Sequence, residues 1–226
     1  MKYKNIIFDF GGTLVNLEPS KDDVFFNVLE RNNIIINKDK ILKAFFNNNI
    51  RQSAIILKNE EDKKIFLIEY NKSILNSLKI KSNIDLLAIE INNEFKKTHW
   101  RISLETIKVL EELRKSGFRL AILSNWENNL RDICDNLGIS NFFELILAST
   151  DVNIEKPSPE FFKIILSRLK MNPNETIYVG DDYEQDVVSA ESVDIKPLLI
   201  DKYGFYSNKN CDKIRNLKSI FLFVNE

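Results

Sequence analysis

Two kinds of hydrophobic periodicity divide the chain. Residues 4–14, KNIIFDFGGTL, contain a short apolar run without a polar face, which is typical of a strand covered by helices on both sides. From residue 18 to about Trp100, apolar residues recur only at the spacing of amphipathic helices. After Ser103, helical and strand-like patterns alternate, and repeated units of this kind imply a parallel sheet with helices on both faces. The pattern therefore predicts an α/β core that is interrupted by a helical insertion.

The insertion is expected to contain four helices, with Asn37 and Asn83 as the N-caps of the second and the fourth. The core should continue with a helix that is capped by Ser103 and ended by Gly117. The apolar faces of the four inserted helices fall in residues 24–29, 41–46, 67–78 and 84–95. The expected core helices are 103–116, 127–137, 159–169, 183–192 and 213–218, and the expected strands are 118–123, 144–149, 176–179, 196–200 and 220–224.

The end of the first strand carries residues suited to anion chemistry. Asp9 is followed by Gly11 and Gly12, which let the backbone turn sharply, and by the hydroxyl of Thr13. Ligands of open α/β sheets collect beyond the carboxyl ends of the strands. A carboxylate at this place could attack a bound phosphoryl group, although a helix-capping aspartate would look the same in sequence.

Three later segments place further polar residues near strand ends. Ser124-Asn125 follows LAIL, Lys156-Pro157 precedes a predicted helix, and Gly180-Asp181-Asp182 follows TIYV, with Asp186 shortly after. Each segment alone is explained by a cap, an exposed lysine or a solvated acidic turn. Together they supply a nucleophile, a hydroxyl donor, a cation and a second acidic cluster, which are the parts that phosphoryl transfer needs.

Composition narrows the classes of partner. The 226 residues are 44% hydrophobic, enough for a packed core, and 32 basic against 33 acidic residues give a formal charge of −1. Neither nucleic acid nor a membrane is expected to bind this chain. The first ten residues lack the apolar core of a signal peptide, so a cytoplasmic location is expected.

The four segments DFGGTL, LSN, Lys156 within EKPSPEFF, and GDDYEQD resemble, in order, the four motifs of the haloacid dehalogenase superfamily of hydrolases. The resemblance implies a Rossmann-like three-layer core with a parallel sheet and an inserted all-helical cap. Residues 1–16 and 100–226 would form the core, and residues 17–99 would form the cap.

The resemblance also implies roles for single residues. Asp9 would be the nucleophile that forms an aspartyl-phosphate, Lys156 would neutralise charge, and Mg²⁺ would be the cofactor. The other implied catalytic or substrate-binding residues are Gly12, Thr13, Ser124 and Asn125, with Lys156 in both roles. The implied metal-binding residues are Asp9, the carbonyl of Gly11, and Asp181, with Asp182 or Asp186 in support.

Gly11 departs from the family pattern, because phosphatases of this family usually have an acid–base aspartate two residues after the nucleophile. Enzymes that cleave carbon–halogen bonds also lack an acid there, so a metal-independent haloacid dehalogenase is an alternative, as is a catalytically weak phosphate-binding protein. The paired Asp181-Asp182 favours the phosphatase, because it retains the charge that Mg²⁺ requires.

The expected substrate is a small phosphorylated metabolite, and the expected assembly is a monomer or a homodimer. Substrate selectivity should lie in the cap, where Arg31, Arg51 and Gln52 are candidates.

Overall fold

The computed structural model of the chain describes residues 2–48 and 59–224. Contacts between Cα atoms divide the chain into two compact units. The first unit combines Met1–Asn16 with Arg101–Glu226, and the second is Leu17–Trp100.

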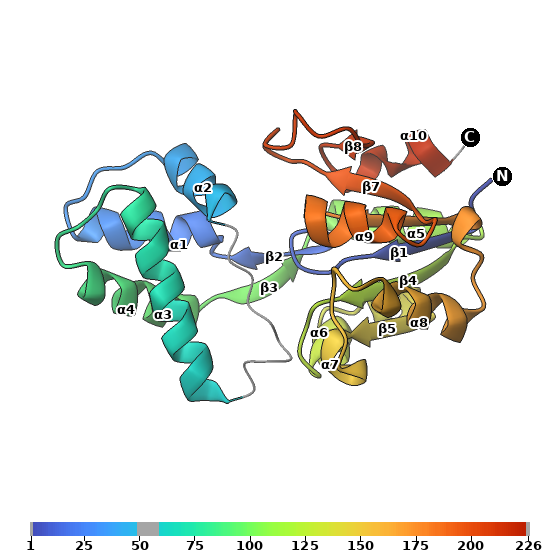
Figure 1. Cartoon of the computed structure of the whole chain (residues 1–226), viewed down its shortest axis with the longest axis horizontal. Helices are drawn as coiled ribbons and strands as arrows, with labels where there is room; N and C mark the ends of the chain where they lie inside the picture. Colours follow the sequence, from blue (N-terminus) through green and yellow to red (C-terminus); the bar gives the residue numbers. More distant parts are fainter. Residues whose placement is uncertain (1, 49–58, 225–226) are drawn as a thin grey trace. The chain divides into compact units, whose positions relative to one another are not determined.

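The first unit is built on a parallel sheet of six strands in the order β5-β4-β1-β6-β7-β8 (Figure 1). At its centre, Ile7 of β1 is in register with Ala121 of β4 and with Tyr178 of β6. All three belong to a buried cluster with Phe162 of α8. The central strands read as continuous apolar runs because helices cover both of their faces. The strands are β1 (Asn5–Phe8), β4 (Arg119–Ser124), β5 (Leu145–Ala148), β6 (Thr176–Gly180), β7 (Lys196–Ile200) and β8 (Lys213–Ile214).

Helices complete the three layers of this unit and confirm the predicted Rossmann-like core. In Figure 1, α8 and α9 cover the near face of the sheet and α5 lies behind it. Ser103 is the N-cap of α5, and its side chain accepts a hydrogen bond from the Thr106 N–H, as predicted. The helices are α5 (Leu104–Lys115), α6 (Leu130–Asn136), α7 (Ser149–Val152), α8 (Pro159–Leu169), α9 (Ser189–Glu191) and α10 (Phe221–Val224). The 3₁₀ helices are η1 (Ser140–Phe142), η2 (Pro173–Glu175) and η4 (Leu217–Ile220), and η3 (Tyr183–Val188) is a π-helix.

The second unit packs its helices around its own apolar cluster, with fully buried Phe25 in edge contact with Phe45. Asn37 caps the second helix, as predicted, through a hydrogen bond from the Asp39 N–H. Asn83 occupies the N-cap position of the fourth helix, as predicted, but it adopts a left-handed conformation with φ 54° and its side chain makes no capping hydrogen bond. The helices are α1 (Lys21–Arg31), α2 (Lys38–Asn47), α3 (Glu60–Ser77) and α4 (Ile84–Phe95).

Three other predictions from the pattern are wrong. Two short strands, β2 (Val15–Glu18) and β3 (His99–Ile102), pair with each other where no strand was expected. Residues 213–214 form β8 instead of starting a helix, because they pair with β7. The expected closing strand at 220–224 is helical, and a short apolar run does not by itself separate a buried strand from a buried helix.

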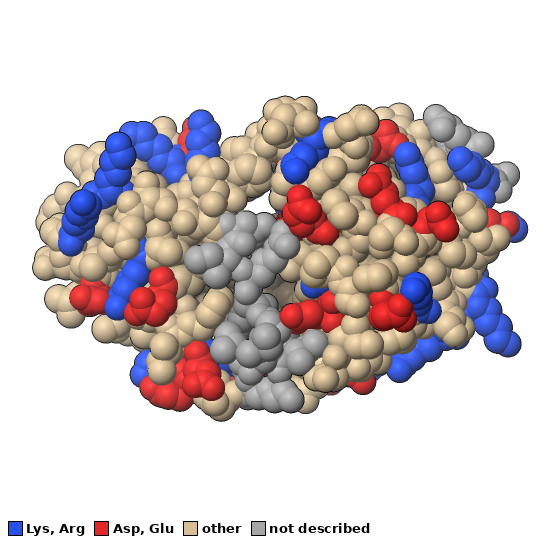
Figure 2. Space-filling model, in the orientation of Figure 1, with Lys and Arg blue, Asp and Glu red and all other residues tan. Residues whose placement is uncertain are grey.

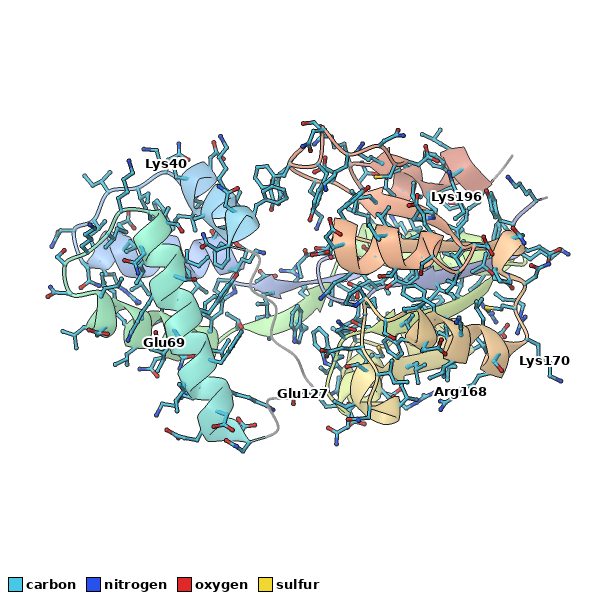
Figure 3. The ribbon with its side chains drawn as sticks, viewed as in Figure 1. Lys40, Glu69, Glu127, Arg168, Lys170 and Lys196 are labelled. Carbon is cyan, nitrogen blue, oxygen red and sulfur yellow. The ribbon has the colours of Figure 1, made fainter. Side chains whose placement is uncertain are left out.

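Charged side chains of both signs are scattered over the face shown in Figure 2. In the stick view, Lys196 marks the start of β7 and Lys170 follows α8, at the end of the core opposite the strand ends that carry the site (Figure 3). No helix in the described part of the chain is long and apolar enough to cross a bilayer.

Candidate active site

Asp9 follows β1 directly and is held by hydrogen bonds to β6, to β4 and to the loop that carries Lys156. Its N–H donates to the carbonyl of Val179 at 2.8 Å, and its side chain is buried with the residue only 6% exposed. Ser124 Oγ donates to Asp9 Oδ1 at 3.0 Å, and Lys156 Nζ donates to the same oxygen at 2.7 Å. Within the described residues no donor reaches Asp9 Oδ2, so one oxygen of this carboxylate is anchored and the other is left for chemistry.

Lys156 is the cationic centre of the site. Its ammonium donates to Asp9 Oδ1 at 2.7 Å, to Asp186 Oδ1 at 2.7 Å and to the Tyr178 hydroxyl at 2.9 Å. Burial alone would lower the pKa of Lys156, but the carboxylates of Asp186 and Asp9 outweigh burial and hold this pKa well above its ordinary value. The lysine is therefore a fixed positive charge beside Asp9.

Asn125 fixes the loop that carries this lysine. Its side-chain amide donates to the Lys156 carbonyl at 2.9 Å, and its side-chain carbonyl accepts from the Lys156 N–H at 2.7 Å. Both ends of the Asn125 amide therefore hold the backbone of Lys156 in place.

Three carboxylates converge on one point. Asp9, Asp181 and Asp186 each offer an oxygen within 4.8 Å of the others. Two glycines allow this approach: a Cβ at Gly12 would lie 2.2 Å from Asp181 Oδ2, and a Cβ at Gly180 would lie 2.2 Å from Asp186 Cγ. Hard cations such as Mg²⁺ prefer oxygen ligands of this kind. The donor set therefore fits a divalent cation.

Asp186 and Asp182 have different surroundings. Asp186 Oδ1 accepts from Lys156, and its Oδ2 accepts from the Asp182 N–H at 2.9 Å. Burial raises the pKa of Asp186 to about 6, against the opposing effect of Lys156. Asp182 caps η3, because its Oδ1 accepts from the Gln185 N–H at 2.8 Å. The acidic turn thus contributes Asp181 and Asp186 to the cluster, while one oxygen of Asp182 holds the following helical segment.

The turn that contains Gly11 and Gly12 is held by contacts with Val15. The Gly12 N–H donates to the Val15 carbonyl at 2.8 Å, and Gly12 has a φ of +82°. Gly11 forms an isolated β-bridge with Val15, and its backbone does not adopt a positive φ. Thr13 is buried, and its hydroxyl has no hydrogen-bond partner among the described residues. Gly12 therefore serves the turn and the approach of Asp181 rather than offering a free amide.

Tyr178 was not predicted as a site residue. It is fully buried in β6, and its hydroxyl lies 2.9 Å from Lys156 Nζ, 3.2 Å from Asp186 Oδ1 and 3.0 Å from the Leu123 carbonyl. The only sequence signal is a phenolic hydroxyl within the otherwise apolar strand TIYV.

Of the three candidates for substrate selectivity, the structure describes Arg31. Arg31 forms ion pairs with Glu90 at 3.3 Å and Glu94 at 3.0 Å inside its own unit. Arg51 and Gln52 lie outside the described residues.

Comparison with known proteins points to one family. Residues 6–200 match the model of the haloacid dehalogenase-like hydrolases. A glyceraldehyde 3-phosphate phosphatase of Methanocaldococcus jannaschii is 31% identical over 133 residues, covering 50% of this chain and 56% of the relative. The chain spans about half the length of the curated relatives it matches.

Solved structures share the fold across two activities. A phosphatase from Thermococcus onnurineus superposes with a TM-score of 0.59 at 22% identity, covering 98% of this chain and 97% of the other. The L-2-haloacid dehalogenase of Xanthobacter autotrophicus superposes with a TM-score of 0.64 at 16% identity, covering 99% and 98%. The fold therefore does not distinguish a phosphatase from a haloacid dehalogenase. The distinction must come from the residues of the site.

Proposed function

The chain belongs to the haloacid dehalogenase-like hydrolases, and we propose that it is a Mg²⁺-dependent phosphatase of small phosphorylated metabolites. The observation that carries this proposal is the convergence of Asp9, Asp181 and Asp186 beside the Lys156 ammonium. Three carboxylates beside a single ammonium leave negative charge that a divalent cation would offset. The sequence relative named as a glyceraldehyde 3-phosphate phosphatase supports the same reaction class.

Asp9 Oδ2 is the proposed nucleophile, because Oδ1 is anchored by Ser124 and Lys156. Oδ2 attacks the phosphorus of a phosphate monoester, and the bond from phosphorus to the alcohol oxygen breaks with its electron pair leaving on that oxygen. Lys156 offsets negative charge on the phosphoryl group, and the Ser124 hydroxyl turns to donate to a phosphoryl oxygen. Water then attacks the phosphorus, the bond to Asp9 breaks, and inorganic phosphate leaves.

Mg²⁺ would be held by Asp9, Asp181 and the carbonyl of Gly11, with Asp186 behind them, and when bound it would neutralise further charge on the phosphoryl oxygens. Asp186 also accepts from Lys156 and from the Asp182 N–H, so it orders the lysine and the acidic turn at once. The chain's own contribution is to hold these carboxylates close together before any ligand arrives.

Gly11 sets the preferred leaving group. With no carboxylate there, the departing alcohol oxygen takes its proton from solvent, and general acid help of about 10²- to 10⁴-fold is lost. Aryl phosphates, whose leaving oxygens need little protonation, should react faster than alkyl phosphates.

The domain assignment is part of the proposal. Residues 1–16 and 100–226 form the catalytic core, and residues 17–99 form a helical cap that selects the substrate. The division of the chain at Leu17 and Trp100 into two compact units supports this assignment.

The test uses purified protein with p-nitrophenyl phosphate and a panel of metabolite phosphates, in Mg²⁺ and in EDTA. Phosphate release should need Mg²⁺, and it should be abolished in Asp9→Asn and fall in Asp181→Ala. Asp182→Ala is the matched acidic control, expected to retain more activity because Asp182 caps η3.

A haloacid dehalogenase is the second candidate, favoured by one observation: Gly11 stands where phosphatases carry their acid, and a departing halide needs no proton. Chloride release from 2-chloropropionate in EDTA, without phosphate release in Mg²⁺, would replace the phosphatase with this reaction.

A further inference from the structure

We infer that Tyr178 is the positioning residue of the Lys156 ammonium, and this inference rests on the proposed function wherever it concerns catalysis. Its side chain is fully buried in β6 and would not touch substrate. Its effect is exerted through Lys156, whose ammonium lies 2.9 Å from the Tyr178 hydroxyl.

The tyrosine reaches across the central strand of the sheet. β1 lies between β4 and β6, yet the Tyr178 hydroxyl of β6 reaches to 3.0 Å from the Leu123 carbonyl of β4. Its ring packs edge-on against Phe162, with centroids 4.9 Å apart. The hydroxyl is therefore fixed beside the carboxyl end of β1, where Asp9 begins.

The hydrogen-bond inventory makes this hydroxyl the third acceptor of the lysine. An ammonium has three N–H donors, and Lys156 has three acceptors: Asp9 Oδ1, Asp186 Oδ1 and the Tyr178 oxygen. The tyrosine oxygen also lies 3.0 Å from the Leu123 carbonyl and 3.2 Å from Asp186 Oδ1, and either of these oxygens can accept its single proton. A lone pair of the tyrosine oxygen thus faces Lys156.

Without this acceptor the ammonium keeps its charge but loses a fixed direction. One N–H would be left buried without a partner, and the lysine would turn to share its remaining donors between two carboxylates. The charge would then be misplaced for the phosphoryl group, which depends on preorganised donors. The loss should therefore appear in kcat more than in KM.

The direct test observes the ammonium itself by ¹⁵N NMR of the lysine side chains in the full chain. A signal protected from exchange with water should be present in the wild type and absent in Lys156→Met, which assigns it. In Tyr178→Phe its exchange should be about tenfold faster or more, because one charge-assisted hydrogen bond is lost.

Two control variants separate positioning from general loosening. Tyr3→Phe removes a hydroxyl from another buried tyrosine, which precedes β1 at the opposite end of the sheet, and it should leave the signal unchanged. Phe162→Leu loosens the packing around the Tyr178 ring but keeps the hydroxyl. Thermal melting of all variants sets the stability against which the exchange rates are compared.

The inference fails if no protected signal exists in the wild type, or if Tyr178→Phe matches Tyr3→Phe. It also fails if Phe162→Leu reproduces the effect of Tyr178→Phe at equal loss of stability. In the phosphatase assay, Tyr178→Phe should lower kcat about tenfold with little change in KM. If the wild type hydrolyses no phosphate ester, the proposed function fails, whereas the NMR result still decides whether Tyr178 positions Lys156.

Discussion

Replacing Gly12 with alanine should damage the acidic cluster more than it damages the fold. Gly12 has a φ of +82°, and a Cβ there would lie 2.2 Å from Asp181 Oδ2 and 2.8 Å from Asp181 Cγ. The new methyl group therefore meets two penalties, a strained backbone and a collision with a carboxylate that we propose binds Mg²⁺.

The chain offers a control that carries only the first penalty. Gly117, which follows α5, has a φ of +87°, and a Cβ there would meet nothing within 4 Å. Left-handed backbone costs an alanine about 1–2 kcal/mol, so Gly117→Ala should lose about that much free energy of unfolding. Gly12→Ala should lose about 1–3 kcal/mol more, the usual cost of overpacking, because the Asp181 carboxylate must retreat by about 1 Å.

The displacement should also weaken metal binding. A ligand that binds only the native state stabilises it by about 2.7 kcal/mol at one hundred times its dissociation constant. A tenfold weaker site loses about 1.4 kcal/mol of that gain. Urea unfolding with and without Mg²⁺ measures both quantities for the wild type, Gly12→Ala and Gly117→Ala.

Gly117→Ala should keep the full Mg²⁺-dependent gain in stability, and Gly12→Ala should lose about half of it if its site is tenfold weaker. The reasoning is refuted if the two variants lose the same free energy of unfolding and respond equally to Mg²⁺. In that case Asp181 either moves freely or does not bind the metal.

Three further predictions follow from the same site. Lys156→Met should cost about 3–5 kcal/mol of unfolding free energy, because two buried carboxylates lose their cation. Urea unfolding measures this loss, with Lys163→Met at an exposed lysine as the control. Equal losses in the two variants would contradict the prediction. Gly11→Asp should raise alkyl phosphate turnover about tenfold by returning a proton donor at a backbone position that needs no positive φ; a folded variant that responds to Mg²⁺ with unchanged turnover would contradict the missing-acid account. Burial raises the folded-state pKa of Asp186 from 3.8 to about 6, so its contribution to the stability of the metal-free protein is fully present below pH 3.8 and is lost as the pH rises through about 6. Urea unfolding across that range should show this loss in the wild type and not in Asp186→Asn, and identical profiles would disprove it.

The elements that could be predicted are those whose own sequence determines them. The apolar runs of β1, β4 and β6 indicated buried parallel strands, and the side chains of Asn37 and Ser103 cap their helices as expected. The short β8 could not be found this way, because its two residues are ordered only by pairing with β7. Asn83 shows the same limit. Its residue type suits an N-cap, but in its left-handed conformation the side chain makes no capping hydrogen bond.

The sequence could predict which residues of the site meet, because parallel strands bring their carboxyl ends together. Asp9, Ser124 and Asp181 each lie at or just after the carboxyl end of a parallel strand, so their meeting follows from the topology. Their division of labour does not follow from it. In sequence, Asp182 and Asp186 were equivalent supports for Asp181, but η3 turns one into a helix cap and the other into a partner of Lys156.

Tyr178 lies beyond the reach of such reasoning for a physical reason. In a strand buried on both faces, a tyrosine fits the pattern as one more large apolar residue, and its ring does pack against Phe162. The hydroxyl acquires a role only because the sheet order places β4 two strands away from β6, within reach of the phenol, and because Lys156 enters from a separate loop with a third donor that Asp9 and Asp186 do not use. A buried polar atom in a core strand is therefore a stronger pointer to the site than its sequence context suggests, since burying that atom without partners would cost stability.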